Sequence, residues 1–341
     1  MSKKSITLTL LVNKRTFGKM SKFVDVYGLG NAVVDISVSV SDERFASLRL
    51  PRGTSISTSP EDQDRLIRAV DNGKMKFSSG GSVGNSIFGL AELGGRGAFS
   101  GLAGYDEAGK HYFGDLIKAG IQVGNSFFVE GSSTSTCLVV VTPDGERTMR
   151  LALGAGKDLS PEHVQRDYSR VSRWTFIEGY LLSNGSEGLE TISEAFTQAR
   201  EFQSKVALAV SSPHIATEYR EQLKSMLPEC ALVIANEAEA QELTGESSWE
   251  AAFAALKDKA PGVVVTGGAR GALIWFDNKE AHVPALKVKA VDSTGAGDAF
   301  AAGLLLGLAR GMEAPAAAKE GCELAAQVIQ HFGARLPRSP V

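Results

Sequence analysis

The sequence predicts an α/β protein with a mostly parallel central sheet, helices on both faces of that sheet, and a small additional sheet. From residue 171 onward, short apolar stretches alternate with segments of helix-forming residues. This alternation is typical of a parallel sheet that is buried on both faces. Stretches nearer the N-terminus alternate polar and apolar residues instead, and these predict the second sheet.

The composition is that of an ordinary soluble globular protein, with 43% hydrophobic and 22% charged residues in a chain of 341. The net charge of -3 and the lack of a basic patch with interleaved aromatic residues argue against nucleic-acid binding. No apolar run reaches the roughly 18 residues that a membrane-spanning helix needs. We therefore expect a cytoplasmic monomer or homodimer that has neither nucleic acid nor membrane as a partner.

The first 22 residues differ from the rest of the chain, because they contain no acidic residue and six basic ones: Lys3, Lys4, Lys14, Arg15, Lys19 and Lys22. The apolar run at 6–12 is short and no small-residue cleavage site follows it, which argues against a signal peptide. Organelle targeting and a start at Met20 both fit this pattern. We expect residues 1–22 to be a basic extension and residues 23–337 to form the folded domain.

The first strand of the central sheet is predicted at residues 23–29, and the chain continues extended through residues 36–40. Ser alternates with Ile and Val in the second of these stretches, which indicates a strand with one polar face. Gly28 and Gly30 match part of a dinucleotide-binding pattern. However, the third glycine of that pattern is absent and no helix start follows, which argues against a dinucleotide site.

A glycine-rich turn precedes a predicted helix that ends at residues 94–95. Gly80 and Gly81 lie in the turn, and Asn85 lies in the first part of the helix. Backbone without side chains allows a ligand to approach closely, although the same pattern also fits an ordinary capped helix.

The small sheet is predicted from segments that do not fit the strand–helix alternation. Residues 98–102 predict another core strand, followed by a helix to residue 119. Residues 121–141 then alternate in the manner of strands, Asp144-Gly145 predicts a hairpin turn, and residues 146–150 begin the return strand. We expect the small sheet to comprise about 36–55 and 121–150.

Two further groups of polar residues follow predicted core strands. Asn236 and Glu239 come after the strand at 231–234 and match a helix capping box. Thr266, Gly268 and Gly271 lie between the strands predicted at 263–265 and 273–276. Ligand sites of parallel sheets lie at the carboxyl ends of the strands, so we expect these motifs to share one site.

The most informative stretch is 292–303, Asp-Ser-Thr-Gly-Ala-Gly-Asp-Ala-Phe-Ala-Ala-Gly, after a strand predicted to end at 288–291. A helix that is apolar on every side begins at Asp298, so it must be buried and its N-terminus must be fixed inside the fold. Such an N-terminus can bind an anion. Asp298 can then take a proton from a hydroxyl that attacks a phosphoryl group. Alternatively, the stretch is only a tight strand-to-helix connection.

The stretch 292–303 resembles the C-terminal signature of the PfkB family of carbohydrate and nucleoside kinases, which have a three-layer ribokinase-like fold. The resemblance implies that Asp298 is the catalytic base. It also implies that Gly295, Ala296 and Gly297 form an anion hole for the transferred phosphate. The Gly-Gly and Asn of residues 80–85 resemble the N-terminal signature of the family, so the substrate hydroxyls are expected on Gly80, Gly81 and Asn85.

The resemblance also implies ATP and Mg²⁺ as cofactors. Asn236 and Glu239 resemble the metal and phosphate motif of the family, in which the Glu acts on Mg²⁺ through water. Thr266 and Gly268 are expected on the ATP phosphates, and Gly271 is expected to permit close packing. In several members a monovalent cation lies at the positions of Asp292 and Thr294, so potassium is a further expectation, with residues 333–335 closing its site. The resemblance further implies that the small sheet forms a lid over the substrate.

The residues of the first predicted strand bear on the identity of the acceptor. Residues 27–36 are similar to the first strand of adenosine-kinase-like members, in which Asn31 follows the glycine and Asp35 binds ribose hydroxyls. Sugar kinases of the family more often have Glu at the position of Asn31. We therefore expect a nucleoside kinase, with adenosine first and a ribokinase- or fructokinase-type sugar kinase as the alternative. A non-catalytic binding relative and an NAD-dependent dehydrogenase are the two remaining hypotheses.

Overall fold

A computed structural model describes residues 23–71, 73–124 and 128–337 of the chain. An eight-stranded sheet has the order β15-β14-β13-β12-β11-β10-β1-β5, and its strands from β5 to β13 are parallel. The pairs β13–β14 and β14–β15 are antiparallel. The strands are β1 (Val24–Leu29), β5 (Gly97–Ser100), β10 (Ser172–Glu178), β11 (Lys205–Ala209), β12 (Leu232–Asn236), β13 (Val263–Thr266), β14 (Ala272–Phe276) and β15 (Lys279–Val283).

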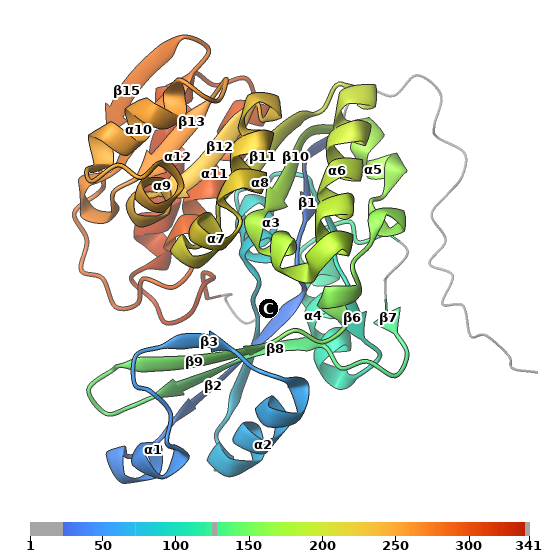
Figure 1. Cartoon of the computed structure of the whole chain (residues 1–341), viewed down its shortest axis with the longest axis vertical. Coiled ribbons are helices and arrows are strands. Elements are labelled where there is room, and N and C mark those ends of the chain that lie inside the picture. Colours follow the sequence, from blue (N-terminus) through green and yellow to red (C-terminus); the bar gives the residue numbers. More distant parts are fainter. Residues whose placement is uncertain (1–22, 72, 125–127, 338–341) are drawn as a thin grey trace, which may run out of the picture.

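Helices cover both faces of this sheet and bury one hydrophobic cluster on each face. One face is covered by α3 (Ser82–Glu92), α4 (Glu107–Lys118), α11 (Ala296–Ala309) and α12 (Ala314–Val328). The other is covered by α5 (Arg166–Val171), α6 (Gly185–Phe202), α7 (Pro213–Glu218), α8 (Arg220–Met226), α9 (Glu237–Thr244) and α10 (Trp249–Lys257). The predicted three-layer arrangement is therefore confirmed (Figure 1).

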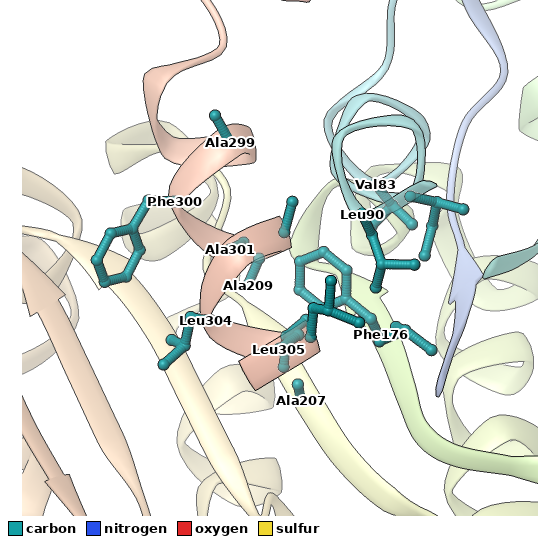
Figure 2. Packing of buried hydrophobic residues seen from close by; sticks show 14 of the residues in the cluster. Val83, Leu90, Phe176, Ala207, Ala209, Ala299, Phe300, Ala301, Leu304 and Leu305 are labelled. Carbon is teal, nitrogen blue, oxygen red and sulfur yellow. The ribbon is translucent and has the colours of Figure 1, made fainter. Parts of the chain in front are cut away.

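Helix α11 is central to the first of these clusters, as its all-round apolar sequence predicts. Figure 2 shows its side chains Phe300, Leu304 and Leu305 among residues of the sheet and of α3. Complete burial of each such side chain stabilises the fold by about 1.5–3 kcal/mol. The packing therefore fixes the axis of α11, and with it the position of the turn at its N-terminus.

A second sheet of five strands has the order β3-β9-β8-β2-β4 and lies beyond the end of β1, which continues directly into it (Figure 1). Its own small core includes Ile36, Phe45 and Leu138. Helices α1 (Asp42–Leu48) and α2 (Pro60–Val70) contribute to that core. The strands are β2 (Val33–Ser39), β3 (Ser55–Ser57), β4 (Lys76–Ser79), β8 (Ser135–Val141) and β9 (Arg147–Ala152); β6 (Ala103–Gly104) and β7 (Phe128–Val129) form a separate pair.

The structure corrects four local expectations. Residues 42–48 form a helix, because Ser41 accepts a hydrogen bond from the backbone of Arg44 and caps it. Residues 76–79 form a strand that pairs with β2, although its sequence does not alternate. Between 121 and 124 only Gln122 forms a bridge, and residues 125–127 lie outside the described part. Residues 288–291 are not a strand, since the N–H of Val291 bonds to Ile329 beyond α12.

Among the described residues, no helix has both the length and the apolar character required to cross a membrane.

Candidate active site

The carboxylate of Asp298 lies in the first turn of α11 and faces the first turn of α3. Its Oδ1 accepts a hydrogen bond from Ser82 Oγ at 2.6 Å, and its Oδ2 accepts one from Asn85 Nδ2 at 2.9 Å. Burial raises the pKa of Asp298, while these two hydrogen bonds and the charge of Arg335 lower it. The predicted base and one predicted substrate residue are therefore in direct contact, although 213 positions separate them in the chain.

Two glycines, Gly295 and Gly297, lie in the turn before Asp298, and their surroundings differ. Gly295 has a φ of 77°, and a Cβ atom there would lie 2.5 Å from the backbone of Ala334. At Gly297 a Cβ atom would meet nothing within 4 Å, so the turn opens into free space at this point. The N–H of Ala296 bonds to Ser293 at 3.2 Å, and the next residues begin the helix. A helix N-terminus next to open space is suited to an anion.

The other predicted substrate residues lie where β1 enters the small sheet. A Cβ atom at Gly80 would lie 2.5 Å from Asp35 Oδ2, and one at Gly81 would lie 2.4 Å from the carbonyl oxygen of Asn31. The glycine pair therefore packs directly against the two residues that were predicted to hold ribose. Asn85 follows one helical turn later, and its N–H donates to the carbonyl oxygen of Gly81 at 2.8 Å.

Sequence reasoning missed Glu178, which is the last residue of β10 and is 1% exposed. Its Oε1 accepts the N–H of Asn31 at 2.8 Å, and its Oε2 accepts the N–H of Val83 at 3.2 Å. Glu178 thereby connects Asn31, a predicted substrate residue, to α3. Gly30 is required beside it, because a Cβ atom there would lie 2.7 Å from Glu178 Oε2. An acidic residue directly after a predicted buried strand was the signal available in the sequence.

Several carboxylates near Asp298 have raised pKa values. Burial raises the pKa of Asp35 to about 6, that of Glu178 to about 7 and that of Glu239 to about 7. The charge of Asp298 adds to the rise in each case. A cation or a set of hydroxyl donors would relieve this repulsion. The donor set thus fits an acceptor rich in hydroxyl groups and a hydrated Mg²⁺ ion.

This cluster predicts a pH dependence of stability for the ligand-free protein. A raised carboxyl pKa means that the folded state favours the protonated form of the group. Each such carboxyl therefore contributes its full stabilisation below the unfolded pKa near 4, and this stabilisation is lost as pH rises through about 6 to 7. We expect the melting temperature to fall between pH 5 and pH 8. For Glu178 the loss is at most roughly 3 kcal/mol. Glu178→Gln should make this fall shallower in thermal denaturation, whereas the exposed Glu229→Gln should not; equal slopes in all three proteins would contradict the prediction.

Of the residues predicted to surround the nucleotide, the structure brings Asn236, Glu239 and Thr266 together. Asn236 and Glu239 form the predicted capping box, in which Asn236 Oδ1 accepts the N–H of Glu239 at 2.9 Å and Glu239 Oε2 accepts the N–H of Asn236 at 3.0 Å. Thr266 is the register partner of Asn236 on the neighbouring strand. Gly268 and Gly271 follow with φ values of 58° and 94°, and a Cβ atom at Gly271 would lie 2.0 Å from the carbonyl oxygen of Val283.

Within the part of the chain that the structure describes, no group of three or more His, Cys, Asp or Glu side chains is arranged to hold a metal ion.

Arg147 is a second residue that sequence reasoning missed. It begins β9 in the small sheet, and its guanidinium donates hydrogen bonds to Asp292 Oδ2 and Thr294 Oγ1. Asp292 also accepts the N–H groups of Thr294 and Gly333, at 2.9 and 2.8 Å. Burial raises the pKa of Asp292, but these donors outweigh it and hold the pKa at about 2. The small sheet thus places a positive charge at the turn that leads to Asp298.

Residues 333–335 divide between two tasks. The N–H of Gly333 donates to Asp292 Oδ2 at 2.8 Å, so this segment lies against one of the two residues at which potassium was expected. Arg335 instead donates from Nε to Asn85 Oδ1 at 2.8 Å and lies 4.3 Å from the ring centroid of Phe88. Because Arg335 engages the amide oxygen, the amide nitrogen of Asn85 is directed to Asp298. The C-terminal segment therefore helps to orient the predicted base.

These groups have the chemical capacity for transfer of a phosphoryl group to a hydroxyl. Asp298 can accept a proton, the N-terminus of α11 and Arg147 can stabilise developing negative charge, and Asp35 can accept hydrogen bonds from an acceptor. The fold and this site together define a small-molecule phosphotransferase.

Comparison with known proteins identifies the family. The model of the pfkB family carbohydrate kinases matches residues 60–340, and the chain belongs to this family. Adenosine kinase 2 of Arabidopsis thaliana is 27% identical over 339 residues, which cover 92% of this chain and 96% of that protein. The protein is thus a phosphotransferase that acts on a nucleoside or a sugar.

Solved structures of similar proteins have the same fold as this chain. The structure titled adenosine kinase from Sinorhizobium meliloti has a TM-score of 0.84 and 29% identity, and the comparison covers 93% of this chain and 96% of that chain. The probable sugar kinase from Rhizobium etli has a TM-score of 0.85 and 29% identity over the same shares. The ribokinase-like fold expected from the sequence is confirmed.

Proposed function

We propose that the protein transfers the γ-phosphate of ATP to the primary hydroxyl of a nucleoside, and that adenosine is its acceptor. The observation that carries the proposal is the contact between Asp298 and Asn85, since it joins the anion-binding turn to the acceptor residues. The similarity to adenosine kinases supports the nucleoside over the sugar.

The acceptor lies against the glycine pair in this proposal. The carboxylate of Asp35 accepts hydrogen bonds from two vicinal ribose hydroxyls, and Asn31, Gly81 and Asn85 surround the same sugar. A charged acceptor of this kind gives strong discrimination against analogues that lack a hydroxyl. Glu178 holds Asn31 in place through the backbone hydrogen bond described above.

Phosphoryl transfer then takes place at the N-terminus of α11. Asp298 takes the proton of the attacking hydroxyl, while Ser82 and Asn85 keep the carboxylate oriented. The N–H groups near Gly297 and the guanidinium of Arg147 stabilise the oxygens that gain charge. Glu239 would hold the hydrated Mg²⁺ ion of the nucleotide, which would supply positive charge to the phosphates. Asn236, Thr266, Gly268 and Gly271 form the surroundings of the ATP phosphates.

The small sheet acts as a lid in this proposal. Its strand β9 carries Arg147, whose contacts with Asp292 and Thr294 connect the sheet to the anion-binding turn. Closure over the acceptor excludes water and so prevents hydrolysis of ATP. Because Arg147 donates to both Asp292 Oδ2 and Thr294 Oγ1, a potassium ion at these two residues would have to displace its guanidinium.

Replacement of Arg147 tests this role of the lid. We expect Arg147→Gln to lower kcat/KM for ATP by about 10- to 100-fold, because a donor to developing negative charge is lost. Arg52→Gln is the matched control, since Arg52 lies on the same lid but pairs with Asp42 and Asp144. Initial rates at varied ATP, with and without K⁺, provide the measurement. Equal effects of the two replacements would contradict the role of Arg147.

The acceptor is tested by ADP release from Mg-ATP with adenosine, inosine, guanosine, cytidine, ribose and fructose, each with and without K⁺. We expect strong turnover with adenosine. Turnover with ribose or fructose alone would retain the assignment as a kinase and make a sugar the acceptor in place of a nucleoside. The similarity to a probable sugar kinase is consistent with that alternative acceptor. A folded protein that binds ATP and turns over none of these acceptors would contradict the proposal and favour a non-catalytic binding protein.

A further inference from the structure

An open cavity of about 830 Å³ lies at the opposite end of the central sheet from the candidate active site. The N-terminal ends of β1, β10 and β11 line it, together with the C-terminal ends of α3 and α11. Its charged lining consists of four basic side chains and one carboxylate: Arg96, Arg173, Lys205, Arg310 and Asp25. The kinase mechanism uses none of these residues.

The single carboxylate cannot neutralise the four cations. Asp25 is 4% exposed and forms ion pairs with two arginines. Its Oδ1 lies 3.3 Å from Arg96 Nη2 and 3.8 Å from Arg173 Nε. Lys205 has aromatic neighbours, with its Nζ 5.5 Å from the ring centroid of Trp174. Arg310 donates to the carbonyl of Gly94 at 2.9 Å and so caps the end of α3. Excess positive charge therefore gathers here in a chain whose net charge is -3.

The ends of α3 and α11 offset only part of this charge, because the dipole of each helix places about half a negative charge at its C-terminus. The cavity has the size of a small-molecule site. Arginine side chains bind phosphate oxygens in a bidentate manner, and lysine adds a point charge. We propose that this cavity binds a small phosphate-bearing polyanion at a site separate from the kinase centre.

The elements that end in the cavity are those that carry the proposed catalytic groups. Helix α11 runs from Asp298 to the cavity, α3 runs there from Asn85, and β10 runs from Arg173 to Glu178. A helix of 14 residues spans about 20 Å, so a ligand in the cavity contacts the far end of the same rigid elements. We therefore expect the polyanion to change kinase turnover. This second expectation rests on the proposed function, whereas binding itself does not.

The test uses inorganic pyrophosphate as the probe and isothermal titration calorimetry as the readout. The full chain is first saturated with adenosine and β,γ-methylene-ATP, so that the kinase centre is filled. We expect one further pyrophosphate to bind, with an affinity that falls as NaCl is raised from about 50 to 300 mM. Arg173→Gln with Lys205→Gln should weaken it by about tenfold or more, because two close charges are removed. These two residues are chosen because neither caps a helix.

The matched control is Lys224→Gln with Lys319→Gln, which removes two surface charges that pair with Glu221 and Glu323 outside the cavity. It should bind pyrophosphate as the unaltered protein does. Thermal denaturation checks that both double variants fold. If the variant with Arg173→Gln and Lys205→Gln does not fold, Lys205→Gln alone replaces it, with an expected loss of pyrophosphate affinity of about threefold. Absence of a further pyrophosphate site, or equal affinity in all proteins, would overturn the proposal. Because binding is measured directly, failure of the kinase assignment would leave this result readable.

Discussion

Asp298→Asn should reduce kcat by about 100- to 10,000-fold, because the amide cannot take the proton of the attacking hydroxyl. The change preserves the size of the side chain, and one oxygen still accepts a hydrogen bond from Ser82 or Asn85. We therefore expect the dissociation constants of ATP and acceptor to change little. Single-turnover rates and equilibrium binding of both ligands separate these two effects.

The matched control for this change is Asp277→Asn, at an exposed turn with φ of 50° that Asn also tolerates. It should leave kcat unaltered. In the unaltered protein, burial raises the pKa of Asp298, so the loss of rate on acidification should begin above the ordinary aspartate pKa near 4. Full turnover of Asp298→Asn would exclude Asp298 as the base.

Asp35→Asn should raise the KM for adenosine by about 100-fold and leave the KM for ATP unchanged. The reason is that a neutral amide oxygen replaces a carboxylate that, in our proposal, accepts hydrogen bonds from two hydroxyls, and hydrogen bonds to charged groups contribute about 1.5–3 kcal/mol each. Steady-state rates with adenosine, 2′-deoxyadenosine and 3′-deoxyadenosine measure this. The unaltered protein should discriminate strongly against both analogues, and Asp35→Asn should discriminate weakly.

Asp42→Asn is the control for Asp35→Asn, because Asp42 also belongs to the small sheet region but lies on its exposed helix α1. If Asp35→Asn discriminates between adenosine and its deoxy analogues as well as the unaltered protein does, Asp35 does not hold the ribose hydroxyls.

The sequence allowed prediction of those parts of the site that depend on local patterns. The all-round apolar sequence after Asp298 required a buried helix, and the glycine pair required a close approach at residues 80–81. Both requirements are met, and they bring Asn85 and Asp298 into contact. The strand–helix alternation after residue 171 is also a local pattern, and it predicted the parallel sheet. A strand that is covered by helices on both faces of a sheet must be apolar along its whole length.

The residues that were missed depend on long-range geometry. Arg147 reaches Asp292 only because the register of the β8–β9 hairpin, and the position of the whole small sheet, place it there. Glu178 is a single carboxylate with no flanking motif, and its importance follows from its contacts with Asn31 and Val83. Strand β4 was missed because its residues, Lys-Phe-Ser-Ser, are mostly exposed and do not alternate.

The central claim is that the γ-phosphate of ATP is transferred to the primary hydroxyl of a nucleoside. The most direct measurement follows radiolabel from [γ-³²P]ATP into nucleoside, with adenosine and 5′-deoxyadenosine compared in parallel. Our account predicts labelled adenosine 5′-monophosphate from the first and no labelled nucleoside from the second. Label in 5′-deoxyadenosine, or label released only as inorganic phosphate with both nucleosides, would contradict the account.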